Sequence, residues 1–218
     1  MYDYGTRIGH VRITVFGATG RTGRPLVEQA VERGHEVVAF ARSPGDVEPR
    51  DGVTVVEGDA YAGTGVKEAV ADSDAVVSVL GQTSDGPDDL LTVAGDHILG
   101  AMAEHGVDRF VTLVGAGVRE AGESVSLSGR VMSTLLKLAA RSVLNDAEDH
   151  VERVRATDLD WTVVRAPRLA DGEGTGDYRA GDVALGFESV TRADVARFIL
   201  DCLEKDLYVH AMPKVGSA

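Results

Sequence analysis

The chain contains a glycine-rich segment, Gly17-Ala18-Thr19-Gly20-Arg21-Thr22-Gly23, directly after a run of β-branched and aromatic residues. Where a strand turns into a helix, the first glycine permits a tight turn and the second lets the backbone approach a diphosphate. The third lets the helix pack close to the sheet. Exposed N–H groups and the helix dipole favour an anion at such a helix start. The segment therefore predicts a site for the diphosphate of a dinucleotide.

The residues after the second predicted strand indicate which dinucleotide this site prefers. The chain reads Ala39-Phe40-Ala41-Arg42-Ser43 there, and the next acidic residue is Asp46. A carboxylate at this point accepts hydrogen bonds from the ribose 2′-hydroxyl of NAD, whereas an arginine forms charge-assisted hydrogen bonds with the 2′-phosphate of NADP. We expect Arg42, with Ser43 and Arg21, to bind that phosphate, so that NADP(H) is preferred over NAD(H). The alternative is that Arg42 is a solvated loop residue.

Short apolar runs separated by helical patterns form the elements that position these residues. The strand candidates are residues 11–16, 36–40, 53–56, 75–80, 109–114 and 161–165, and residues 207–212 are a candidate terminal strand. Near-continuous apolar runs are typical of parallel strands covered on both faces. Strands that alternate with helices imply right-handed crossovers. The sequence therefore predicts an α/β fold, a single-domain Rossmann fold with a doubly wound, mostly parallel sheet of six or seven strands.

The sequence also predicts where helices begin and end and which of their faces are buried. Pro25 suits the first turn of the first helix, and Gly34 is placed to end it. Thr191, followed three residues later by Asp194, indicates a capped start for the last helix. The predicted buried faces of two helices are Leu91, Ala94, Ile98 and Met102, and Val195, Phe198, Ile199, Cys202 and Leu203.

Length and composition limit the class of protein. With 218 residues, 44% of them hydrophobic, the chain has enough apolar surface for one core. We expect one domain over residues 11–218, preceded by an N-terminal extension, residues 1–10. No apolar run approaches the roughly 20 residues of a membrane-spanning helix. Because residues 1–10 also lack the basic and apolar regions of a secretion signal, we expect a cytoplasmic protein with no membrane contact.

The charged residues and the cysteine count exclude further classes. The chain has 22 basic and 35 acidic residues, a net charge of −13, and such a field repels the phosphates of nucleic acids. Cys202 is the only cysteine, so neither an intrachain disulfide nor a multi-cysteine metal site can form within one chain. We therefore expect neither nucleic acid nor a bound metal ion as a partner.

Three segments do not fit the alternation, namely residues 82–89, 115–129 and 166–190, where glycine and acidic residues replace the apolar periodicity. Loops that follow strand ends form the ligand crevice of an open α/β sheet. We expect these segments to carry substrate specificity; the alternative is that they are surface loops without a specific role. Residues 131–144 are apolar enough to cover a substrate pocket or a subunit interface. The sequence leaves open whether the chain forms a homodimer or binds a regulatory protein partner.

Five segments together resemble a known family. They are GATGRTGRPLVEQAVERGHEVVAFARSP, EGDA, AVVSVLG, AMAEHGVDRFV and LDWTVVRAPRL. The chain resembles the atypical short-chain dehydrogenase/reductases over residues 11–212, in the branch with NmrA-like proteins and the biliverdin/flavin reductase type. The resemblance implies cofactor contacts beyond the glycine segment. These are Asp59 and Ala60 at the adenine, Leu80, Gly81 and Gln82 at the adenosine ribose and phosphates, Leu113, Val114 and Gly115 under the nicotinamide ribose, and Ala166, Pro167 and Arg168 near the nicotinamide.

The usual proton donors of that superfamily are missing. Many of its members use a Tyr-x-x-x-Lys pair, in which lysine lowers the pKa of the tyrosine. None of the five tyrosines in this chain is followed by a lysine at that distance. The positions at which related branches place a serine, or a lysine, glutamate or histidine, hold Gly115, Ala147 and Val151. The catalytic residues are therefore unknown from the sequence.

Three hypotheses follow from this departure. A flavin, quinone or similar conjugated acceptor needs little more than orientation next to the nicotinamide, so the protein would be an NADPH-dependent reductase. Alternatively, the protein binds NADP(H) without turnover, as a redox sensor or assembly protein of the NmrA-like type. In the third hypothesis an unconventional acid donates the proton, and the candidates are His150, Glu148, Lys137, Ser126 and Ser128.

Overall fold

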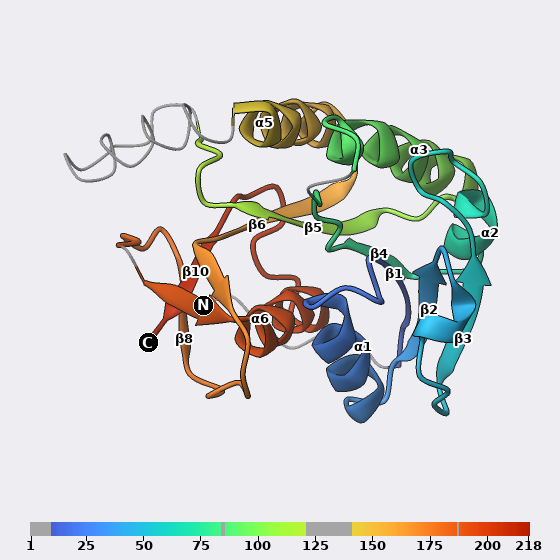
Figure 1. The fold of residues 1–218 in the computed structure, drawn as a ribbon, viewed down its shortest axis with the longest axis horizontal. Helices are drawn as coiled ribbons and strands as arrows, with labels where there is room; N and C mark the ends of the chain where they lie inside the picture. The colour runs from blue at the N-terminus through green and yellow to red at the C-terminus, as the bar shows by residue number, and fades with distance from the viewer. Residues whose placement is uncertain (1–9, 84–85, 121–140, 187) are drawn as a thin grey trace, which may run out of the picture.

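Runs of β-branched and aromatic residues form one large sheet at the centre of the molecule (Figure 1). A computed structural model describes residues 10–83, 86–120, 141–186 and 188–218. Within these ranges the sheet has eight strands in the order β3-β2-β1-β4-β5-β6-β10-β8. Their bounds are β1 Arg12–Phe16, β2 Glu36–Ala41, β3 Val53–Glu57, β4 Ala75–Ser78, β5 Arg109–Gly115, β6 Asp160–Ala166, β8 Tyr178–Gly181 and β10 Lys214–Ser217. Every pair in the sheet is parallel except β10 and β8.

The order of the strands creates a crevice next to β1. The chain builds outward from β1 through β2 to β3, and it then crosses to the other side of β1 to form β4. The connections that follow β1 and β4 therefore leave in opposite directions from the carboxyl ends of neighbouring strands, and ligands of open α/β sheets bind at such a point. The predicted doubly wound Rossmann fold is confirmed.

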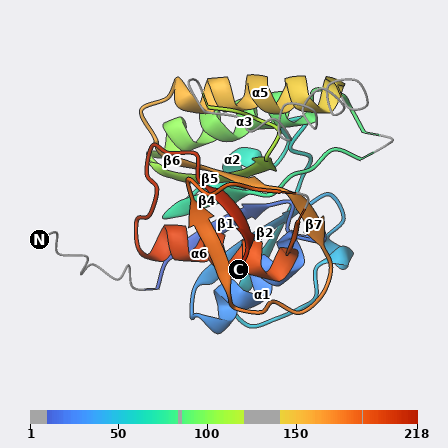
Figure 2. The same cartoon turned by 90° about the vertical axis from the view of Figure 1, so that its left-hand side faces the viewer.

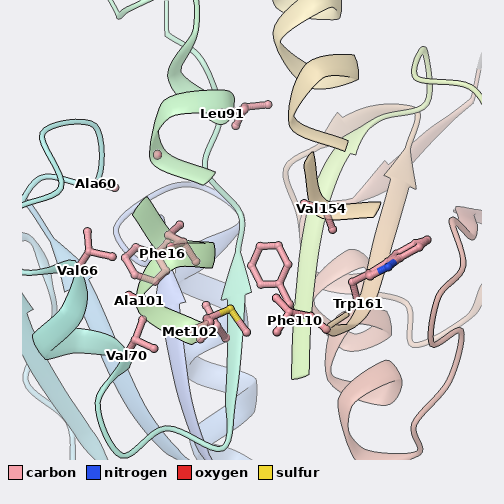
Figure 3. Packing of buried hydrophobic residues seen from close by; sticks show 14 of the residues in the cluster. Phe16, Ala60, Val66, Val70, Leu91, Ala101, Met102, Phe110, Val154 and Trp161 are labelled. Atoms are coloured by element: carbon pink, nitrogen blue, oxygen red, sulfur yellow. The ribbon is translucent and has the colours of Figure 1, made fainter. Parts of the chain in front are cut away.

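Helices cover both faces of the sheet (Figure 2). The helices α2 (Val66–Val70), α3 (Leu90–His105) and α5 (Arg141–Arg155) lie on one face, and α1 (Gly23–Glu32) and α6 (Arg192–Glu204) lie on the other (Figure 1). A short 3-10 helix, η1 (Pro44–Asp46), follows β2. Two hydrophobic clusters lie between these layers. Figure 3 shows part of the first cluster, where Phe16, Phe110 and Trp161 of three strands and Met102 of α3 are buried.

The helix predictions hold in detail. The predicted apolar faces of α3 and α6 are buried throughout. The Thr191 hydroxyl accepts a hydrogen bond from the Asp194 N–H at 3.0 Å and donates one to the Asp194 carboxylate at 2.7 Å, so this pair caps α6. After the end of α1, Gly34 adopts a φ of 88°, which only glycine takes up readily.

The C-terminal third of the chain differs from the expectation. The predicted strand over residues 207–212 is wrong, because Tyr208 and His210 have φ values of 57° and 56° that place them in turns. The seventh parallel strand is β10, four residues with a central glycine. The segment 166–190, which showed no periodicity, contains β8 and also β7 (Arg168–Ala170), which pairs with β9 (Ser189–Thr191). These strands are too short to display a pattern in the sequence.

Candidate functional site

The glycine turn between β1 and α1 closes on its own backbone. The Gly20 N–H donates to the Gly17 carbonyl oxygen at 2.9 Å, and Gly17 has a φ of 86°. A Cβ on Gly17 would lie 2.9 Å from the carbonyl oxygen of Val79, which follows β4. A Cβ on Gly23 would overlap the carbonyl oxygen of Gly17 and lie 2.7 Å from the Ala18 Cα. The third glycine is therefore required by the turn itself.

The start of α1 has a positive electrostatic character. Its first turn contains no acidic residue, and Thr22, at the N-cap position, forms no side-chain cap hydrogen bond. Arg21 and Arg24 flank this helix start, and the Arg24 Nε donates to the Thr19 carbonyl oxygen at 3.1 Å. Cationic side chains and unpaired N–H groups at a helix start are the groups that bind a diphosphate.

A cavity of about 530 Å³ lies at the carboxyl ends of β2 and β3 and is lined by Arg42, Glu57, Gly58, Asp59 and Thr64. Within the part of the chain that the structure describes, the exposed Arg42 forms neither a hydrogen bond nor an ion pair. One oxygen of Asp59 accepts the N–H groups of Tyr61 and Ala62, at 2.8 and 3.2 Å. The cavity therefore combines one free guanidinium with two carboxylates.

Glu57 is a cavity residue that sequence reasoning missed. It is the last residue of β3 and lies opposite Ala41 in the register, one residue before Arg42. The apolar run ends at Val56, so nothing in the sequence shows that the next side chain shares a cavity with Arg42. Only the parallel pairing of β2 and β3 brings these two charges together.

The residues that follow β4 lie beside the glycine turn. The Val79 N–H donates to the Phe16 carbonyl oxygen at 2.9 Å, which holds this segment beside the glycine turn. Gly81 is exposed, and a Cβ on it would meet no atom within 4 Å. The Gln82 side chain donates hydrogen bonds to the Asp88 carbonyl oxygen at 2.6 Å and to the Asp146 carboxylate at 2.7 Å. That Leu80, Gly81 and Gln82 contact the adenosine ribose and the phosphates stays a prediction.

Several other residues predicted to contact the cofactor have buried side chains, so they can contact a ligand only through their backbone. Leu113 and Val114 of β5, Ala166 of β6, and Ala60 are buried in the two hydrophobic clusters. Gly115 is exposed at the end of β5, and the next N–H, that of Ala116, donates to the Ala166 carbonyl oxygen at 2.7 Å. The structure brings these strand ends to the same edge of the sheet, and Pro167 and the exposed Arg168 follow β6 there.

The loop after β7 contacts the glycine turn through a charged group that the sequence gave no reason to select. Asp171 lies 3.6 Å from the Arg21 guanidinium and 2.6 Å from that of Arg192 at the start of α6. The side chains of Arg21 and Asp171 are 74% and 68% exposed, so this ion pair is weak and screened by salt. Arg21 is therefore free to exchange Asp171 for a phosphate.

Of the five candidate proton donors, the structure describes His150 and Glu148. His150 of α5 is 2% exposed, its Nε2 lies 3.1 Å from the Thr112 hydroxyl, and burial lowers its pKa to about 4. It is therefore neutral and shielded from solvent at pH 7. Glu148 is exposed on the same helix. Lys137, Ser126 and Ser128 lie outside the described residues, as does most of the apolar stretch 131–144.

A glycine turn at the switch point of a 3-2-1-4-5-6 parallel sheet defines a Rossmann-type nucleotide-binding protein. A family model described as NAD(P)H-binding matches residues 17–206, and the chain belongs to this family. The chain is 28% identical over 203 residues to YwnB of Bacillus subtilis strain 168, a protein described as uncharacterized. That match covers 89% of this chain and 92% of YwnB. The NAD(P)-binding family predicted from the sequence is confirmed.

Solved oxidoreductases share the fold. The chain superposes on ChuY of Escherichia coli O157:H7, described as an anaerobilin reductase, with a TM-score of 0.78 and 21% identity, over 94% of this chain and 97% of ChuY. The oxidoreductase ylbE of Lactococcus lactis gives a TM-score of 0.78 at 19% identity, over 95% of this chain and 91% of ylbE. The chain therefore shares its fold with these two proteins. No described helix is long and apolar enough to cross a membrane.

Proposed function

We propose that the protein is an NADP(H)-binding oxidoreductase that transfers a hydride between NADPH and a small conjugated acceptor of the flavin, quinone or carbonyl type. The proposal is carried by the unpaired Arg42 in an open cavity, at the same sheet edge as the glycine turn. Family membership and the shared fold of ChuY, described as an anaerobilin reductase, support a reductase.

The chain's own residues have distinct roles in this proposal. The turn from Gly17 to Gly23 binds the diphosphate, and Arg42 with Ser43 binds the 2′-phosphate. Among the described residues, an added Cβ on Gly81 or Gly115, at the ends of β4 and β5, would meet no atom within 4 Å, which leaves space for a ligand there. The bound nicotinamide supplies the hydride chemistry, and the protein contributes orientation of the acceptor. A flavin or quinone reduced in this way takes its proton from solvent, so its reduction does not require a Tyr-x-x-x-Lys pair.

Glu57 weakens the proposed preference for NADP(H) over NAD(H). Its carboxylate shares the cavity with Arg42 and lowers the positive potential there. The preference for NADP(H) therefore depends on direct hydrogen bonds from the Arg42 guanidinium, which the 2′-hydroxyl of NAD(H) cannot match in strength.

A second function, a redox sensor or assembly protein that binds NADP(H) without turnover, is favoured by a different observation. Within the described residues, the one candidate acid on the inner side of α5, His150, is buried away from solvent. A protein of this kind would bind a protein partner in a nucleotide-dependent way and oxidise no NADPH.

One titration series tests both functions. The purified protein is titrated with NADPH and with NADH at low and at high salt, and a flavin and a quinone are then added to the same samples. Tighter binding of NADPH, followed by loss of the NADPH absorbance, is the result expected for the reductase. Tight binding without oxidation would favour the sensor. No binding of either nucleotide by the folded protein would overturn both proposals.

A further inference from the structure

Asp146 is a carboxylate of α5 that is only 4% exposed and accepts hydrogen bonds from two other parts of the chain. Its Oδ2 accepts from the Leu91 N–H at 2.8 Å and from the Gln82 Nε2 at 2.7 Å. Its Oδ1 accepts from the Thr92 N–H at 2.9 Å. Leu91 and Thr92 belong to the first turn of α3, where Asp89, the N-cap residue, forms no side-chain cap hydrogen bond. Asp146 therefore supplies, from another helix, the cap that α3 lacks.

The same carboxylate determines the orientation of the Gln82 amide. The Gln82 Nε2 donates to Asp146 Oδ2 and also to the Asp88 carbonyl oxygen, at 2.6 Å. Both partners are acceptors only, so the amide cannot be rotated to exchange its nitrogen and oxygen. Both N–H groups of the amide are used in these two hydrogen bonds. The remaining polar atom of the side chain is Oε1, which can accept a hydrogen bond but cannot donate one.

The position of Gln82 in the fold gives this orientation a consequence for binding. Gln82 lies three residues after Val79, whose N–H is hydrogen-bonded to the last residue of β1, directly before the glycine turn. A phosphate needs a donor, and the Gln82 side chain has none left. A ribose hydroxyl can donate to Oε1.

We propose that Asp146 is a positioning residue, which fixes the amide of Gln82 so that Oε1 accepts a hydrogen bond from a ribose hydroxyl of the bound dinucleotide. This inference rests on the proposed function, because it requires a dinucleotide in the crevice. The resemblance implies that the adenosine ribose and the phosphates lie near Gln82. The inference assigns a ribose hydroxyl, and not a phosphate, to the Gln82 side chain.

The main test is the variant Asp146→Asn, which has nearly the same shape. The new side chain has one acceptor oxygen in place of two, so it can no longer accept from Gln82 Nε2 and from both N–H groups of α3, and the orientation of the Gln82 amide is no longer fixed. We expect the Kd for NADPH to rise by about three- to tenfold, the usual effect of one hydrogen bond. An unchanged Kd with a lower melting temperature would show that Asp146 only caps α3, and would overturn the inference.

Two further variants separate positioning from stability. Thr92→Val removes the hydrogen bond from the Thr92 hydroxyl to the Asp146 backbone carbonyl oxygen, 3.1 Å long, without touching Gln82. We expect it to lower the melting temperature and to leave the Kd unchanged. Gln82→Met leaves both N–H groups of α3 on Asp146 and removes the oriented acceptor, together with the two side-chain N–H groups that hold it in place. We expect it to raise the Kd by the same three- to tenfold, and Asp146→Asn to add nothing further in that background.

The outcomes distinguish this inference from the proposed function. If the unaltered protein binds no NADPH, the proposed function fails. If it binds NADPH and Gln82→Met leaves the Kd unchanged, only the inference fails, even where Asp146→Asn does not fold. Adenosine 2′,5′-bisphosphate identifies the ribose: a weaker affinity of the variants for this fragment assigns the hydroxyl to the adenosine ribose, and a loss seen only with NADPH assigns it to the nicotinamide ribose.

Discussion

The charge at position 42 is the most direct test of cofactor preference, and Arg42→Glu is the sharpest perturbation. Arg42 has no partner to lose within the described residues, so its replacement removes a contact with the ligand and not one within the fold. A charge-assisted hydrogen bond contributes about 1.5–3 kcal/mol. Loss of one such bond to the 2′-phosphate weakens NADPH binding roughly 10- to 150-fold.

The surrounding charges determine where in that range the effect falls. Glu57 and Asp59 already line the cavity, so a glutamate at position 42 creates a group of three carboxylates around the phosphate site. We therefore expect an effect near the upper end for NADPH and a change of less than about threefold for NADH, which lacks the phosphate. The matched variant Glu57→Gln removes one of the opposing charges. It is expected to tighten NADPH binding about twofold at low salt and to have no effect at high salt.

The assay is a fluorescence titration of each variant with NADPH and NADH at two salt concentrations, together with a melting curve as a control for folding. The quantity compared is the ratio of the two dissociation constants, which cancels any general damage to the crevice. An Arg42→Glu variant that binds NADPH as tightly as the unaltered protein would refute the assignment of the 2′-phosphate to Arg42. Arg42 would then be a solvated loop residue.

Three further predictions concern the turn, the cap and the core. Gly23→Ala should abolish NADPH binding in titrations, because its Cβ overlaps the Gly17 carbonyl oxygen, whereas Gly100→Ala on the exposed face of α3 should stabilise the fold by about 0.5–1 kcal/mol in denaturant melts. Burial raises the pKa of the Asp194 carboxyl, but hydrogen bonds from Thr191 and the neighbouring loop lower it by more, so the pKa in the folded state lies below the unfolded value of 3.8. The unaltered protein should therefore lose stability as the pH falls below 3.8, and Asp194→Asn should not show this loss. Burial lowers the His150 pKa from 6.5 to about 4, so the unfolded chain takes up that proton first and about 3 kcal/mol of stability should be lost as the pH falls through this window. Urea melts at pH values between 6.5 and 4 would show how the free energy of unfolding falls with pH. The same fall in the variant His150→Leu would contradict its assignment to His150.

Much of the fold could be predicted because its signals are local. A strand that ends at Gly17 and a helix that Gly34 ends are encoded by adjacent residues. The buried faces of α3 and α6 follow from helical spacing, and the capping pair Thr191 and Asp194 lies within one turn. The strands β7, β8 and β9 were missed because three or four residues do not display a period, and residues 207–212 were misread because apolar residues also pack in turns.

Part of the candidate site was likewise predictable from the sequence, and part of it only the structure shows. The sequence by itself determined the glycine turn and the cation after β2, because both depend on residue types at fixed short spacings. Tertiary structure decided that Glu57 shares the Arg42 cavity, and that Asp146, 64 residues beyond Gln82, orients the Gln82 amide. Electrostatic and hydrogen-bond interactions depend on distance in space, and strand pairing and helix packing set that distance for residues far apart in the chain.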